Sequence, residues 1–298
     1  MKEGIALRGC YTALITPFAG DGVDHAALRA LVEQQVQAGV AGVVPCGTTG
    51  ESPTLSHAEH REVIRTVVEA AQGRVQVIAG CGSNATAEAV ELTRFAAGVG
   101  ADATLQVVPY YNRPQQQGLV RHFRAVAEAS PLPVVLYNIP GRSGVDLLPE
   151  TVAELVRQAP NVVAIKEASG SPARVAELLA LVPELSVLSG DDALTLPMLA
   201  LGAKGVISVA ANLVPERIQR LCTLFLGGDA AGALAEHRAL WELFRALFCE
   251  TNPVPVKFAC ALVHGTGEQV RLPLAPLGEP GRQRVRQALA ALGLLPAA

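Results

Sequence analysis

Lysine is rare in this chain of 298 residues and occurs only at positions 2, 166, 204 and 257. Charged residues make up 17% of the sequence, the formal net charge is −3, and lysine and arginine are dispersed along the chain. A protein that binds the backbone of a nucleic acid or an anionic membrane needs a basic surface. The sequence therefore predicts neither a nucleic acid nor a membrane as a partner.

Motifs for metals, dinucleotides and secretion are missing as well. The six cysteines show no CxxC spacing, which favours a reduced compartment. His57 and His60 are three residues apart, but no third metal ligand follows them, and GxGxxG is absent. No apolar run reaches the ~20 residues of a membrane span, and residues 1–18 lack a secretory signal pattern. We therefore expect a cytoplasmic protein without a metal or a nicotinamide cofactor.

Apolar residues, by contrast, form half of the sequence and can bury a large core. Short apolar runs alternate with amphipathic stretches as far as residue 213, a pattern typical of repeated βα units on a parallel sheet. The runs occupy residues 10–16, 41–46, 75–80, 103–109, 133–138, 162–167, 185–190 and 205–210. Eight such units favour a closed (β/α)8 barrel, an α/β fold, over an open doubly wound sheet.

Helix start and stop signals flank the stretches between the runs. Asp24 is a candidate N-cap and Gly39 a candidate C-cap of one helix. Asn84 and Gly100 flank a later stretch in the same way. These signals place helices between the predicted strands.

The strand signal stops after residue 213, and the rest of the chain is expected to be helical. Helices are predicted within residues 215–248, 252–265 and 280–294. These segments are too short and too apolar to form a free domain. We expect a catalytic barrel over residues 1–225 and a C-terminal helical region over residues 226–298 that packs on it.

Polar residues cluster where the predicted strands end, and in a (β/α)8 barrel these ends form one rim that carries the catalytic groups. Lys166 and Tyr137 each stand at the end of an apolar run. Three other runs are followed by GTTGE (47–51), PYYNRP (109–114) and SGDD (189–192). We therefore expect these residues to surround one site.

Lys166 follows the apolar residues of a strand that is expected to be buried on both faces. Burial disfavours an ammonium group and so leaves more neutral amine to attack a carbonyl substrate, which indicates a Schiff-base lysine. The alternative is a structural lysine that pairs with Glu167 or extends to solvent. The gathering of polar residues at the same rim favours catalysis.

Each of the other rim residues has a functional and a structural interpretation. Thr48 and Thr49 can hold a small carboxylate together with the backbone amides of GTTGE, or this stretch is an ordinary turn. Tyr137 and Tyr111 can transfer protons, or they fill the mouth of the barrel. Arg142 offers a planar fork to a carboxylate, or it is a solvated loop residue.

The motifs GTTGES (47–52), VPYYNRP (108–114), LYNIPGRSG (136–144), IKEASG (165–170), LSGDD (188–192), GVISV (205–209) and NPVPVK (252–257) occur in this order. In this combination the chain resembles the 4-hydroxy-tetrahydrodipicolinate synthase family, also called dihydrodipicolinate synthase, over essentially its whole length. The resemblance implies a (β/α)8 barrel with a C-terminal helical region. It also implies a lyase that condenses pyruvate with L-aspartate 4-semialdehyde to 4-hydroxy-tetrahydrodipicolinate, on the route to diaminopimelate and lysine.

The resemblance assigns roles to the rim residues. Lys166 would form an imine with pyruvate, and Tyr137 would transfer protons together with Thr48 and with Tyr111 of a neighbouring subunit. The substrate-binding residues implied are Thr48 and Thr49 for the pyruvate carboxylate, Arg142 for the carboxylate of the semialdehyde, and the backbone around Gly190 and Ile207. The imine nitrogen is itself an electron sink, so no cofactor is expected. A homotetramer built as a dimer of dimers is expected.

The resemblance also implies an allosteric site for L-lysine at a subunit interface. The matching residues are Ser52, His57, His60, Asn84, Glu88 and Tyr110. Glu88 would meet the ammonium group of the effector and Asn84 its carboxylate, although all of these residues are also compatible with an ordinary helix surface. Pro53 stands where many inhibited members carry alanine, and a proline still presents its carbonyl. Inhibition by lysine is therefore expected.

Two other functions remain as alternatives. A pyruvate-dependent class I aldolase of the N-acetylneuraminate lyase or 2-keto-3-deoxy sugar acid aldolase type would share the barrel, the lysine and the tyrosine. Arg142 and the YYNRP motif favour a short acidic aldehyde instead, because a guanidinium group pairs with a carboxylate. A non-catalytic barrel that only senses lysine would not need Lys166, Tyr137, Thr48 and Tyr111 together.

Overall fold

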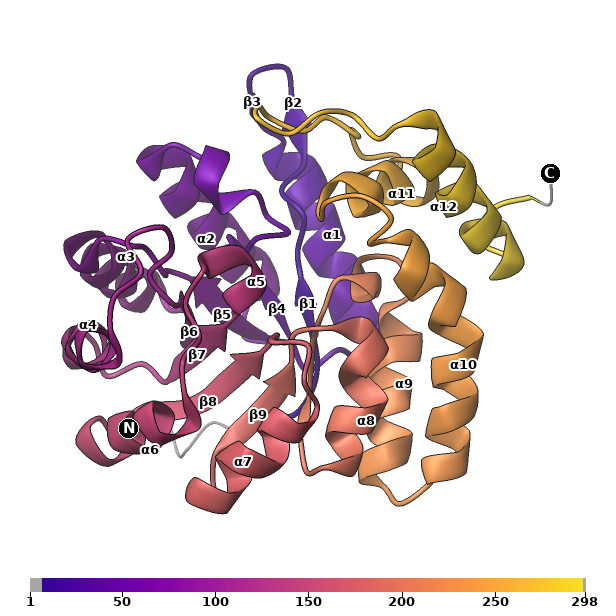
Figure 1. Cartoon of the computed structure of the whole chain (residues 1–298). Helices are drawn as coiled ribbons and strands as arrows, with labels where there is room; N and C mark the ends of the chain where they lie inside the picture. The colour runs from indigo at the N-terminus through magenta and orange to yellow at the C-terminus, as the bar shows by residue number, and fades with distance from the viewer. Residues whose placement is uncertain (1–6, 297–298) are drawn as a thin grey trace.

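Eight parallel strands close into a barrel in the computed structural model of the chain, which describes residues 7–296 (Figure 1). The strands are β1 (Gly9–Ala13), β4 (Gly42–Val44), β5 (Gln76–Gly80), β6 (Ala103–Val107), β7 (Val134–Asn138), β8 (Val162–Glu167), β9 (Ser186–Ser189) and β10 (Gly205–Ser208). β1 pairs with both β10 and β4 to close the sheet. Each strand lies within one of the eight predicted runs, except that β1 begins one residue earlier, and several strands end up to three residues before their run does. The predicted (β/α)8 barrel is confirmed. Residues 1–6, which belong to the stretch without a secretory signal pattern, lie outside the described residues, as do residues 297 and 298.

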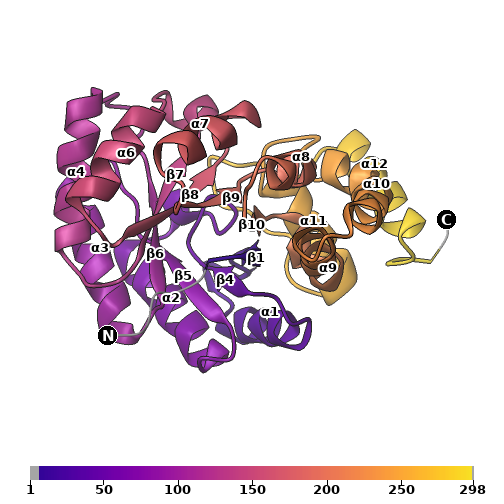
Figure 2. The same ribbon diagram turned by 90° about the horizontal axis from the view of Figure 1, so that it is seen from below.

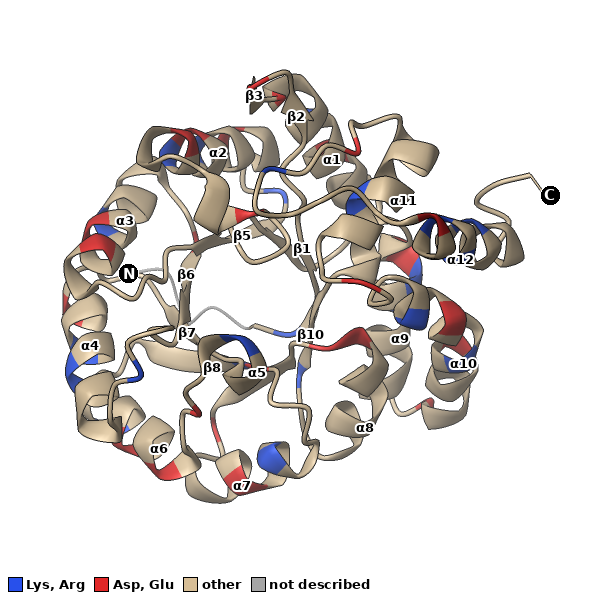
Figure 3. Cartoon of the chain, turned by 45° about the horizontal axis from the view of Figure 1, so that its top comes forward, with Lys and Arg blue, Asp and Glu red and all other residues tan. Residues whose placement is uncertain are grey.

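Helices surround the barrel on its outer face (Figure 2). They are α1 (His25–Gln37), α2 (His57–Ala71), α3 (Thr86–Val99), α4 (Gln116–Glu128), α6 (Pro149–Gln158), α7 (Ala173–Leu181), α8 (Thr195–Ala200) and α9 (Pro215–Leu226). Short elements lie in the loops at the strand ends: β2 (Phe18–Ala19), β3 (Gly22–Val23), η1 (Ser52–Thr54), α5 (Pro140–Ser143), η2 (Asp192–Leu194) and η3 (Ala210–Asn212). Most charged residues lie on the outer helices, and α5 lies over the mouth of the barrel (Figure 3).

The predicted caps are correct for α1 and only half correct for α3. Asp24 accepts a hydrogen bond from the backbone N–H of Ala27, and Gly39 follows the helix with a φ of 68°. Asn84 does not cap α3, because the helix begins at Thr86 and no side chain caps its first turn. The prediction that Asn84 starts this helix is therefore wrong.

Side chains of the strands alternate between the barrel interior and the outer layer beneath the helices. On β8, Ala164 belongs to the interior cluster and Ile165 packs in the outer layer, which places Lys166 on the inner side again. The same alternation on β7 places Val135 and Tyr137 inside. Both faces of β7 and β8 are buried, which is why these two strands appear as nearly continuous apolar runs in the sequence.

The C-terminal helices lie together beside the barrel (Figures 1 and 2). They are α10 (Ala230–Ala246), α11 (Val254–His264) and α12 (Glu279–Ala291). The predicted helical segment 215–248 divides into α9 and α10 at Gly228, which has a φ of 95°. No helix among residues 7–296 is long and apolar enough to cross a membrane.

Candidate active site

Lys166 and Tyr137 lie next to each other at the carboxyl ends of β8 and β7, where they are paired in the strand register. The Nζ atom of Lys166 is 4.3 Å from the centroid of the Tyr137 ring. The two residues are only 7% and 4% exposed. A lysine amine and a phenol ring therefore lie side by side, largely shielded from solvent, at the carboxyl end of the barrel interior.

Lys166 has no ion-pair partner and no hydrogen bond from its side chain among residues 7–296, and its ring contact is with Tyr137. Glu167 points to the other face of β8, where its carboxylate accepts hydrogen bonds from Asn138 Nδ2 at 3.1 Å and from the backbone N–H of Ser169 at 2.6 Å. The alternative in which Lys166 pairs with Glu167 is therefore not the arrangement in the structure. An unpaired buried amine is suited to nucleophilic attack.

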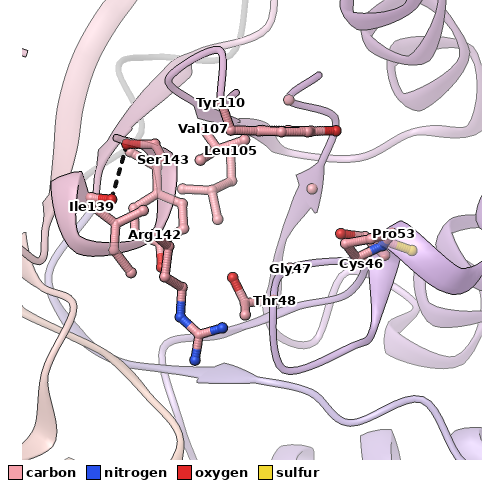
Figure 4. Close-up of a pocket in the computed structure, with 14 residues that line it drawn as sticks. Cys46, Gly47, Thr48, Pro53, Leu105, Val107, Tyr110, Ile139, Arg142 and Ser143 are labelled. Atoms are coloured by element: carbon pink, nitrogen blue, oxygen red, sulfur yellow. Dashed lines mark hydrogen bonds between the residues drawn. The ribbon is translucent and has the colours of Figure 1, made fainter. Parts of the chain in front are cut away.

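A cavity of about 230 Å³ opens at the mouth of the barrel, and Tyr137 forms part of its wall. Its lining residues are Cys46, Gly47, Thr48, Ser52, Pro53, Gly80, Gly82, Leu105, Val107, Tyr110, Tyr137, Ile139, Arg142 and Ser143. The side chains of Arg142 and Thr48 point into this cavity, and Tyr110 and Pro53 lie at its border (Figure 4). A guanidinium group and a hydroxyl group thus face the same space.

The loop after β4 brings Thr48 to the cavity and buries Thr49, which is 3% exposed. Internal hydrogen bonds from the backbone N–H groups of Gly50 and Ser52 to Gly47 O fold the loop tightly. Glu51 has a φ of 53°, a left-handed conformation that is uncommon for a residue other than glycine. Such strain persists only where surrounding contacts hold the backbone in place.

Arg142, on α5, donates a hydrogen bond from Nη2 to the backbone carbonyl of Asn252 at 3.3 Å. Gly190 lies against the catalytic candidate, because a Cβ atom at this position would be 3.2 Å from Lys166 Cε and 2.6 Å from Ala168 Cβ. Ile207 is buried in the barrel interior on β10. The structure thus places all three predicted binding positions at the same end of the barrel.

Tyr111 is the one predicted catalytic residue that is largely exposed on its own chain. Its side chain is 90% exposed, and its φ of 72° is left-handed. Its backbone N–H donates to the carbonyl of Ser143 at 3.3 Å, which ties the tyrosine loop to α5. Tyr110, its neighbour, lines the cavity instead.

A second cavity of about 200 Å³ adjoins the first and shares Ser52, Pro53, Gly82 and Tyr110 with it. Its lining residues are Ser52, Pro53, Leu55, His57, His60, Gly82, Ser83, Glu88, Leu92 and Tyr110. These include every residue of the predicted allosteric set except Asn84. Asn84 lies outside the lining, and its carbonyl accepts a hydrogen bond from Asn112 Nδ2 at 3.0 Å.

Glu88 provides the acidic group of this second cavity. Its carboxylate accepts a hydrogen bond from Ser83 Oγ at 2.5 Å and lies 3.3 Å from His57 Nδ1. His60 is buried, and its Nε2 lies 2.7 Å from the carbonyl oxygen of Gly80. Burial lowers the pKa of His60, so this ring is neutral near pH 7 and donates to Gly80, a residue that lines the first cavity.

Asp192 lies in the SGDD stretch that the sequence analysis placed at the rim, and it is a functional candidate to which that analysis gave no catalytic role. Its buried carboxylate accepts hydrogen bonds from Ser208 Oγ at 2.5 Å and from the backbone N–H groups of Val209 and Ala210 at 3.0 Å each. Burial raises the pKa of Asp192 to about 6. Asp192 therefore fixes the backbone at the end of β10, next to Ile207. Its position in the LSGDD motif is the sequence feature that could have pointed to this residue.

No group of three or more His, Cys, Asp and Glu side chains within residues 7–296 is placed to hold a metal ion.

Comparison with known proteins gives the family: the model of the dihydrodipicolinate synthetase family matches residues 6–292. The chain belongs to this family. A 4-hydroxy-tetrahydrodipicolinate synthase of Sorangium cellulosum is 55% identical over 288 residues, which cover 96% of this chain and 96% of that protein.

Solved structures of dihydrodipicolinate synthases share the fold. The enzyme from Cyanidioschyzon merolae with lysine bound has a TM-score of 0.94 and 45% identity, over 97% of this chain and 99% of that one. The chloride-inhibited enzyme from Acinetobacter baumannii, complexed with pyruvate, has a TM-score of 0.94 and 43% identity, over 97% of this chain and 100% of that one. The predictions of the family and of a lyase with this activity are confirmed, and the sugar-type aldolase alternative is disfavoured.

Proposed function

We propose that Lys166 forms an imine with pyruvate, and that the chain in this way condenses pyruvate with L-aspartate 4-semialdehyde to 4-hydroxy-tetrahydrodipicolinate. The observation that carries this assignment is the buried amine of Lys166, which has no ion-pair partner among residues 7–296 and lies against the ring of Tyr137. The second support is the adjoining cavity, into which Arg142 and Thr48 point. Membership of the family indicates the reaction, and these residues provide the nucleophile and the polar groups that the reaction needs.

The reaction needs only groups of the protein and of its substrates. The neutral amine of Lys166 attacks the keto carbon of pyruvate, water leaves, and a protonated imine forms. The positive nitrogen withdraws electrons, so that a proton leaves C3 and an enamine results. The enamine carbon bonds to the aldehyde carbon of the semialdehyde, and the aldehyde oxygen takes up a proton. The amino group of the semialdehyde then displaces Lys166 from the imine carbon, which closes the ring and frees the lysine.

The proton transfers in this sequence require groups at the cavity wall. Tyr137 is the phenol in contact with the Lys166 amine, and the Thr48 hydroxyl faces the cavity. Tyr111 completes the relay by entering the cavity of a neighbouring subunit, which accounts for a tyrosine that is 90% exposed on its own chain. This role requires a homo-oligomer, and we propose a cytoplasmic homotetramer built as a dimer of dimers.

Thr48 and Thr49 bind the pyruvate carboxylate, and the backbone near Gly190 and Ile207 completes this side of the site. Arg142 binds the carboxylate of the second substrate, because a guanidinium fork recognises a carboxylate with two parallel hydrogen bonds. This arrangement selects a short acidic aldehyde over the polyhydroxylated acceptor of a sugar-type aldolase.

Product formation with purified protein tests this choice of acceptor. With pyruvate, we expect turnover of L-aspartate 4-semialdehyde and none of N-acetylmannosamine. The Arg142→Gln variant should raise the KM for the semialdehyde by about tenfold or more, because it loses a charge-assisted hydrogen bond, and should leave the KM for pyruvate near the parental value. Turnover of the sugar aldehyde at a comparable rate would contradict the proposal.

L-Lysine is the proposed inhibitor, and the second cavity is its proposed site. Glu88 supplies a carboxylate for the side-chain or α-ammonium group of the effector, and the Asn84 segment is proposed to meet its carboxylate. The relative from Cyanidioschyzon merolae was solved with lysine bound. Because the two cavities share Ser52 and Tyr110, an occupant of the second one contacts residues of the first.

Two variants test this regulatory site. The Glu88→Gln variant keeps the shape of the side chain and removes its charge, and His60→Lys places a positive charge beside the effector ammonium. We expect both to raise the lysine concentration for half inhibition by about tenfold or more, since each weakens a charge-assisted contact. An unchanged inhibition curve in both, or a parent protein that lysine does not inhibit, would rule the site out.

A further inference from the structure

The motif NPVPVK, residues 252–257, lies in the C-terminal region, yet it contacts the loop after β4. Asn252 Nδ2 donates a hydrogen bond to Thr49 Oγ1 at 3.1 Å. Further along the same motif, Lys257 Nζ pairs with Glu51 Oε1 at 2.5 Å, and both of these side chains are fully buried. Two separate contacts thus hold the loop and the motif in one fixed arrangement.

Asn252 also contacts Arg142, a second residue of the proposed site, which lines the cavity. Its backbone carbonyl accepts the hydrogen bond from Arg142 Nη2 at 3.3 Å. Arg142 comes from α5 and Thr49 from the loop after β4, so the two residues are far apart in the sequence. Asn252, which is 5% exposed, therefore contacts both Thr49 and Arg142. Thr49 is a proposed ligand of the pyruvate carboxylate, and Arg142 is the proposed ligand of the semialdehyde carboxylate.

The direction of the bond between Asn252 and Thr49 determines where the threonine proton points. A hydroxyl group has one proton to donate and two lone pairs to accept with. The amide of Asn252 donates, so it occupies a lone pair of Thr49 Oγ1 and leaves the hydroxyl proton uncommitted. Among residues 7–296, Thr49 Oγ1 donates no hydrogen bond and Asn252 Oδ1 accepts none. A substrate carboxylate can therefore take the threonine proton.

We propose that Asn252 is a positioning residue that keeps Thr49 as a hydrogen-bond donor to the pyruvate carboxylate while it orients Arg142. This role rests on the proposed function of Thr49 and Arg142. Asn252 reaches Thr49 through its side chain but Arg142 through its main chain. A substitution at this position therefore acts on pyruvate and leaves the contact with Arg142 in place.

The Asn252→Asp variant reverses the polarity of the bond without a change in size. An aspartate accepts the Thr49 proton, so the hydroxyl no longer donates to pyruvate, and a negative charge lies beside the substrate carboxylate. We expect the KM for pyruvate to rise by about ten- to a hundredfold, the effect of losing a hydrogen bond to a charged group, with the KM for the semialdehyde within about twofold of the parent. The Asn252→Ala variant, which only removes the donor, should show a smaller shift of the same kind.

A second set of variants shows whether the effect passes through Thr49. In the Thr49→Val background the hydroxyl is absent, so Asn252→Ala should add little to the pyruvate KM. Borohydride reduction after titration with pyruvate gives an independent readout, because the imine should still form fully on Lys166 in the Asn252 variants, but at higher pyruvate concentration.

Three results would overturn the positioning role. These are parental pyruvate titrations in both Asn252 variants, a rise of the two KM values by the same factor, or fully additive effects with Thr49→Val. A parent protein that traps no pyruvate would instead overturn the proposed function, and the role of Asn252 with it. The two failures are therefore distinguishable in one experiment.

Discussion

Replacing Lys257 with methionine should destabilise the chain far more than replacing a surface lysine or arginine. The Lys257 ammonium and the Glu51 carboxylate are 2.5 Å apart with both side chains 0% exposed. Burial lowers the pKa of Lys257, and the contact with Glu51 opposes this shift. Methionine fills a similar volume, but it leaves the carboxylate of Glu51 buried without its partner.

The magnitude follows from this geometry. Removal of one member of a buried ion pair destabilises a protein by about 3–5 kcal/mol. Glu51 Oε2 keeps a hydrogen bond from the backbone N–H of Arg271 at 3.0 Å, which partly solvates the orphaned charge. We therefore expect a loss of about 3 kcal/mol in the free energy of unfolding, the lower end of that range.

A double-mutant cycle isolates the pair. In Glu51→Gln/Lys257→Met neither charge is left buried, and the new amide oxygen at position 51 can accept from Arg271, so the double variant should be more stable than Lys257→Met alone. Arg29→Met is the matched control, because Arg29 and Glu69 are 50% and 56% exposed in a surface pair. That control should lose less than about 1 kcal/mol.

Urea unfolding, followed by circular dichroism, gives the free energy of unfolding of the parent, of these variants and of Glu51→Gln. The midpoint and the slope of each transition are compared. A Lys257→Met variant that loses no more stability than Arg29→Met would refute the reasoning, as would a double variant whose loss is the sum of the losses in its single variants. Because Glu51 belongs to the loop that carries Thr48 and Thr49, the Glu51 and Lys257 variants should also raise the KM for pyruvate, whereas Arg29→Met should not.

Three further predictions concern the site and the outer helices. Gly190→Ala should lower kcat at least about tenfold, because its Cβ would be 3.2 Å from Lys166 Cε; parental activity would contradict this. The variants Tyr111→Phe and Lys166→Ala are each expected to lose activity. Co-expressed, they should regain it if Tyr111 works in a neighbouring subunit, and mixed oligomers without activity would exclude this role. Burial lowers the pKa of His122 to about 4. The unfolded ring takes up a proton below about pH 6.5, so stability should fall by up to about 3 kcal/mol from about pH 7 to about pH 4, and urea titrations of His122→Asn should lack that part of the slope.

The barrel could be predicted because its strands are buried on both faces. Val162, Ala164 and Ile165 leave no polar face on β8, so the strand stands out as a continuous apolar run. β4 is apolar throughout as well, whereas β6 carries the buried polar residues Thr104 and Gln106 within its run. The convergence of Lys166 and Tyr137 also followed from the sequence, because both end such a run and the carboxyl ends of a barrel meet at one rim.

Long-range contacts of the C-terminal region could not be predicted. Asn252 and Thr49 are separated by 203 positions, and no local pattern states that they meet. The start of α3 at Thr86 instead of Asn84 is a smaller case. Ser83 Oγ accepts from the backbone N–H of Ala85 just before the helix, and no side chain caps its first turn. The NPVPVK motif was visible, but its function depends on which loop it reaches in the fold.

Intact-protein mass spectrometry after borohydride reduction is the most direct test of the central claim. With pyruvate alone, we expect one adduct of the mass of reduced pyruvate, mapped to the peptide that contains Lys166, and no adduct in Lys166→Ala. With L-aspartate 4-semialdehyde also present, less adduct should be trapped and product should form. An adduct at a different residue, or none in the parent protein, would contradict the account of Lys166 as the imine-forming lysine.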